Sequence, residues 1–122
     1  MQIAITIIFS IELALLFTHE MDAIRRQEWK MFIILKDMED EKAYYAFLLL
    51  HIPLYAAVLF LLLSPFSHIA YYVVDIFLLA HMLIHLEFRK HPANKLDGTI
   101  SKMIIDLAGL LAMIHLIVIS IG

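Results

Sequence analysis

Long apolar runs alternate with short polar stretches along the chain and divide it into four segments. A helix needs about 20 mainly apolar residues to cross the hydrocarbon core of a bilayer, and each run approaches or reaches that length. The pattern predicts membrane-spanning helices over about residues 3–24, 43–63, 68–88 and 100–120. We therefore expect an all-α fold in which residues 1–122 form a single membrane-embedded four-helix bundle.

The polar stretch after the first run has a pattern of its own. Residues 25–36 contain no Gly or Pro, and in a helix Trp29, Phe32 and Ile33 would share one side. That arrangement is typical of a helix lying in the membrane interface. We predict an interfacial helical extension over about residues 25–36.

Composition supports the membrane assignment. The chain is 63% hydrophobic and only 17% charged, an apolar share that a soluble domain of 122 residues could not bury. It contains no cysteine, which excludes disulfides, thiolate metal ligands and cysteine nucleophiles. The net charge of −3 and the lack of a basic patch interleaved with aromatic residues argue against a nucleic-acid partner.

The basic residues predict the orientation. All nine Lys and Arg residues lie between the first and second spans, or between or beside the third and fourth. The positive-inside rule places these two loops in the cytoplasm and both termini on the outer side.

Ionisable residues of several spans fall at similar predicted depths. His81 and His85 are four residues apart and so lie on one helix face. At 1.5 Å per residue, five residues of the four spans lie about 6–12 Å above the nearest cytoplasmic anchor. They are His19, His51, His81, His85 and Asp106.

Imidazole and carboxylate groups are ligands that suit Zn, Fe or Mn. The predicted metal ligands are His19, His51, His81 and His85. The predicted catalytic groups are Glu20, Asp22 and Asp106. Either Asp106 or Glu20 would serve as a ligand or general base, and Asp22 would orient His19.

A second polar set lies about 20 Å from the cytoplasmic anchors and consists of Glu12, Asp75 and His115. On straight helices, Asp75 lies about 120° around from His81, and His115 lies nearly opposite Asp106. The two sets of ionisable residues therefore cannot both point fully towards the axis of one bundle. The second set is open to two interpretations, a buried hydrogen-bonded group or a subunit contact.

Residues 19–23 read His-Glu-Met-Asp-Ala and directly follow the first apolar run. This stretch resembles the signature of a family of small four-span bacterial membrane proteins of unknown function. The resemblance covers the first span and this stretch, and the length and layout agree over the whole chain. It implies a bacterial inner membrane and a functional role for His19, Glu20 and Asp22, but no reaction.

These observations favour an intramembrane metal site that acts on a lipid or another membrane-soluble molecule. A non-catalytic alternative is a membrane subunit, an ion or proton path, or a partner-binding module whose polar residues only hold the helices together. A third alternative is a haem-binding electron carrier, because histidines on facing helices can ligate haem. Membrane lipids are the expected partners, and assembly as a homo-oligomer or with a membrane partner protein stays open.

Overall fold

The computed structural model describes residues 2–122, which form four long α-helices and one short 3₁₀-helix. The elements are α1 (Gln2–Arg25), η1 (Glu28–Met31), α2 (Asp40–Leu63), α3 (Ser67–Phe88) and α4 (Thr99–Ile121). Each α-helix is long and apolar enough to cross a membrane. The predicted all-α architecture is confirmed, with four helices that are able to span a membrane.

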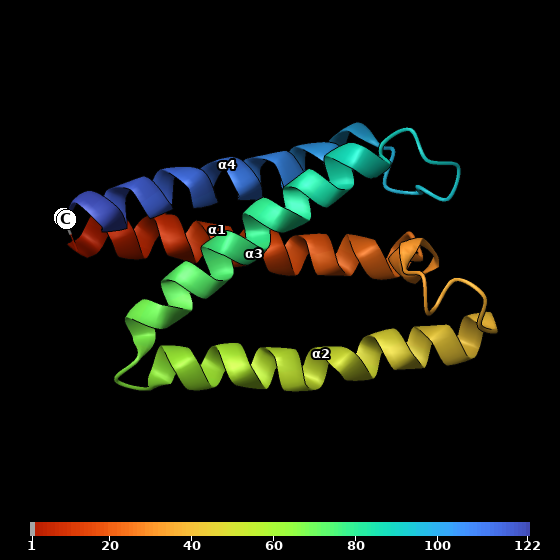
Figure 1. Ribbon diagram of the computed structural model, residues 1–122, viewed down its shortest axis with the longest axis horizontal. Helices are drawn as coiled ribbons and strands as arrows, with labels where there is room; N and C mark the ends of the chain where they lie inside the picture. Colours follow the sequence, from red (N-terminus) through yellow and green to blue (C-terminus); the bar gives the residue numbers. More distant parts are fainter. Residues whose placement is uncertain (1) are drawn as a thin grey trace.

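The four helices are not packed symmetrically (Figure 1). α1 and α4 lie side by side along their length, and α3 crosses them obliquely. α2 lies apart from α4 and is joined to α3 by a tight turn. The loops before α2 and before α4, where most basic residues lie, are at one end of the molecule, and the carboxyl terminus is at the other.

The main core lies where α1, α3 and α4 meet. Its buried residues are Phe9, Leu16, Val74, Leu78, Ala108 and Ala112. Small residues on α4 let the helices approach closely, as is common in membranes. At Gly109, an added Cβ would lie 2.7 Å from the Cβ of Met82, so only glycine fits beside α3 there.

α2 is held at two places. Its buried residues, Ala43 and Phe47, lie near its amino-terminal end, and Val58 and Leu62 farther along pack against the main core. The indole of Trp29 packs against the rings of Tyr44 and Phe47, with centroids 5.7 Å away in both cases. From the turn that joins them, α2 and α3 spread apart, which leaves space between the first half of α2 and the second half of α3.

The structure differs from the predicted helical extension over residues 25–36. α1 ends at Arg25, and Gln27 adopts a left-handed conformation with φ 55° and ψ 49°. This residue reverses the chain, which continues as η1 and then as turns up to Met38. The reversal buries Glu28 and Trp29, each 4% exposed, whereas an interfacial helix would have left them at the membrane surface.

Candidate metal centre

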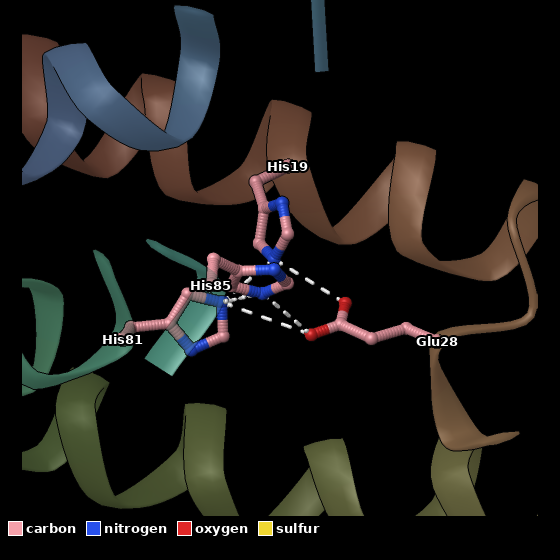
Figure 2. A group of neighbouring side chains, drawn as sticks. All are labelled: His19, Glu28, His81 and His85. Carbon is pink, nitrogen blue, oxygen red and sulfur yellow. Dashed lines mark hydrogen bonds and ion pairs between the residues drawn. The ribbon is translucent and has the colours of Figure 1, made fainter. Parts of the chain in front are cut away.

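Three histidines and one glutamate from three separate elements converge on one point (Figure 2). α1 supplies His19, α3 supplies His81 and His85, and η1 supplies Glu28. The Nε2 atom of His81 lies 2.7 Å from that of His19 and 3.1 Å from that of His85. Glu28 reaches His85 Nε2 at 3.0 Å and His19 Nε2 at 3.3 Å.

The cluster is almost completely enclosed. His19, Glu28 and His85 are 2%, 4% and 5% exposed, whereas the side chain of His81 is 16% exposed. In an apolar surrounding, such groups are stable only when they are paired or hydrogen-bonded. His81 is thus the member of the cluster that is most accessible from outside.

Local structure explains why these side chains meet. The four-residue spacing of His81 and His85 places both on the face of α3 that turns towards α1. Glu28 follows the left-handed Gln27, which directs the chain back beneath the end of α1. The packing of Trp29 against α2 then holds η1 in place.

Glu28 carries the negative charge of the cluster. Burial alone would raise the pKa of this carboxyl group. Hydrogen bonds and electrostatic attraction from His19 and His85 outweigh burial and hold the pKa of Glu28 well below its ordinary value. The carboxylate is therefore ionised and available as a ligand.

The donor atoms are spaced as ligands of one ion would be. Zinc bound tetrahedrally at about 2.0–2.1 Å has ligand atoms about 3.3–3.4 Å apart. The contacts between the Nε2 atoms and the Glu28 oxygens range from 2.7 Å to 3.8 Å. All four residues place a ligand atom within 4.8 Å of the others.

The remaining residues from the sequence-based site lie outside this cluster. His51 pairs with Glu20, with 2.8 Å between Nε2 and Oε2. Asp22 accepts a hydrogen bond from Ser101 and pairs with Arg26 at 3.6 Å, so it does not orient His19.

Asp106 is turned away from the cluster as well. It pairs with Arg89 at the end of α3, and its side chain is 44% exposed. The physical reason is rotation of α4, which turns His115 inward and therefore points the nearly opposite Asp106 outward.

Glu28 was missed by sequence reasoning. On a continuous helix it would lie about 180° around from His19 and roughly 13 Å farther along the axis, too far to share a site. The available signal was its position beside Trp29, the single tryptophan of the chain, within a run of charged residues.

A large apolar groove leads to the cluster. It has a volume of about 770 Å³ and lies between α2, α3 and η1. His81, His85 and Glu28 line it, and so do His51 and Glu20. Its apolar wall includes Phe32, Leu50, Leu54, Phe77, Ile84 and Phe88.

The chain matches one known family over almost its whole length. The sequence model of DUF6713, a family of unknown function, matches residues 5–121. The chain belongs to this family. The prediction of an uncharacterised family is thereby confirmed. No curated protein and no solved structure matches the chain.

The contacts of Glu28 generate a test of its structural role. In chelator-treated protein we expect Glu28→Gln to lower the free energy of unfolding by about 1–3 kcal/mol, because His19 and His85 lose a charged, buried acceptor. Unfolding in mild detergent measures the change. The matched control is Glu39→Gln, because the Glu39 side chain is 65% exposed in its pair with Lys42 and such pairs contribute little. Equal effects of the two variants would contradict the assigned role.

Proposed function

We propose that His19, Glu28, His81 and His85 bind one divalent metal ion and that this membrane protein acts on a lipid or another membrane-soluble molecule at that site. The convergence of three imidazole nitrogens and one carboxylate carries the proposal. These side chains come from helices α1 and α3 and from η1, so no single local motif explains their meeting.

A cation accounts for the cluster better than hydrogen bonds do. His19 and His85 can donate their Nε2 hydrogens to Glu28. The Nε2 atom of His81 then faces two nitrogen atoms, at 2.7 Å and 3.1 Å, that are already engaged. A metal ion would accept lone pairs from the three Nε2 atoms and from the Glu28 carboxylate at once.

Imidazole and carboxylate suit Zn, Fe and Mn alike, so it is the proposed catalysis that favours Fe or Mn over Zn. Four protein ligands complete a tetrahedral zinc site, which is the structural type of site. A six-coordinate ion with the same ligands retains two positions for substrate or water. The haem alternative receives no support, because axial ligands lie on opposite faces of a macrocycle, whereas these nitrogens are neighbours.

His51 and Glu20 supply a proton-transfer pair in the same groove. The Nδ1 atom of His51 lies 2.6 Å from the carbonyl oxygen of Phe47, which can only accept, so Nδ1 carries a hydrogen. The Nε2 atom lies 2.8 Å from Oε2 of Glu20, a hydrogen-bond distance that requires a proton on one of the two groups. We assign this pair as the general acid and base of the reaction.

The walls of the groove favour a lipid as the substrate. Its lining is predominantly apolar, and its few polar groups are those of the cluster and of the His51–Glu20 pair. Such a site would hold an acyl chain along α2 and α3 and present the polar part of the molecule to these groups. The non-catalytic alternative predicts no metal at this site.

Metal content tests the proposal directly. We expect protein purified without a His-tag or chelator to contain Fe, Mn or Zn, and His85→Gln to lower the content by about one equivalent per chain, because one buried ligand is lost. Elemental analysis measures the loss, and circular dichroism checks that the variant remains helical. His91→Gln serves as the control because His91 is exposed in the loop after α3. Unchanged metal content in a folded His85→Gln protein would rule out the site.

Lipid retention tests the groove. We expect a phospholipid to copurify with the wild-type protein and Leu54→Trp to lower its amount, because the larger ring intrudes into the groove. Native mass spectrometry from mild detergent measures the retained lipid. Leu59→Trp is the control on the same helix, because Leu59 is 54% exposed and is not among the residues that line the groove. Retention by both variants would argue against an acyl chain in the groove.

We also propose that the protein lies in a bacterial inner membrane, with both basic loops cytoplasmic and both termini outside. The clustering of Lys and Arg residues supports this orientation. The cysteine-free chain makes the test clean. A membrane-impermeant maleimide should label Pro65→Cys in intact spheroplasts and Asp97→Cys only after lysis. The reverse pattern would invert the topology.

A further inference from the structure

A second polar cluster lies deep among α1, α3 and α4. It consists of Glu12, Asp75 and His115, which are each 0% exposed. His115 Nδ1 lies 2.9 Å from Asp75 Oδ2 and 3.7 Å from Glu12 Oε2. One interpretation from the sequence placed these three residues at a contact between subunits. That interpretation does not fit, because a single chain already buries them completely.

The hydrogen bond between His115 Nδ1 and Asp75 Oδ2 satisfies only part of this cluster. In residues 2–122, seven buried side-chain nitrogen and oxygen atoms lack a hydrogen-bond partner, and four of them belong to this cluster. They are both oxygens of Glu12, Oδ1 of Asp75 and Nε2 of His115. Polar side chains that only hold helices together would instead be paired with one another.

A cation would also balance the charge of this cluster when both of its acids are ionised. Two carboxylates lie beside one imidazole, and the ion pairs described for residues 2–122 bring no Lys or Arg to either acid. The nine basic residues lie at positions between 25 and 42 or between 89 and 102, far along the helices. A divalent metal ion would neutralise both carboxylates, whereas charge left uncompensated in the membrane is costly.

The second cluster is separate from the first. Along α1, Glu12 and His19 are seven residues apart, which corresponds to about 10 Å. Leu16 and Leu78 belong to the buried apolar core and lie between the two clusters in the sequences of α1 and α3. Two ions at these places would not share ligands.

We propose that Glu12, Asp75 and His115 bind a second divalent metal ion, independently of the ion proposed at His19, Glu28, His81 and His85. The spacing of the His115 nitrogen and the two carboxylates, all with one ligand atom within 4.8 Å of the others, suits one nitrogen and two oxygen ligands. Because the site is enclosed within the bundle, its ion supports the packing of α1, α3 and α4 and does not meet the substrate.

Zinc stoichiometry tests this second site. Chelator-stripped full-length protein, loaded with Zn²⁺ and freed of excess metal, should hold two equivalents per chain. Glu12→Gln should hold one, His85→Gln should hold one, and the double variant should hold none. The control Glu87→Gln, at an exposed position of α3, should hold two.

The outcomes separate the two sites. If the folded Glu12→Gln protein retains as much zinc as the wild type, the second site is overturned, whatever the result for His85→Gln. If the wild type and His85→Gln each hold one equivalent of zinc and Glu12→Gln holds none, the second site stands and the first falls. Should Glu12→Gln misfold, anomalous scattering from Mn²⁺-soaked wild-type crystals decides, because a peak beside His115 supports the site and no peak there overturns it.

Discussion

The cost of placing ionisable side chains in an apolar interior governs this structure. An isolated imidazole or carboxylate within the hydrocarbon region is unfavourable by several kcal/mol, so each must meet a partner. α1, α3 and α4 are rotated so that Glu12, Asp75 and His115 meet in one layer. With that rotation, α1 and α3 also bring His19 and the two α3 histidines together. The apolar core between the layers then packs around positions already set by the polar groups.

One backbone residue completes the first cluster. The left-handed conformation of Gln27 ends α1 and turns the chain inward, so that Glu28 reaches histidines of two other helices. The neighbouring Trp29 fills the space against Tyr44 and Phe47 and thereby ties α2 to the same end of the molecule. A single reversal thus supplies the carboxylate and also anchors the helix that forms the far wall of the groove.

The divergence of α2 gives the cluster its access. A tightly closed bundle would have covered His81 on every side. Here α2 and α3 spread apart from the turn that joins them, and the groove between them reaches His81 and His85. The His51–Glu20 pair lines the same groove. The histidine cluster, the His51–Glu20 pair and an apolar wall therefore all border one groove.

Residue pattern by itself determined the helices and their order, because apolar runs of membrane-spanning length have few alternative structures. It also identified His19, His81 and His85 as residues of similar depth, since helical rise converts sequence distance into depth. The sequence did not determine the rotation of each helix about its own axis, because that rotation depends on contacts between helices. Only the tertiary structure turned Asp106 outward to Arg89 and set His51 against Glu20. It alone brought in Glu28, because a left-handed residue after α1 replaced the helix that the local sequence favours.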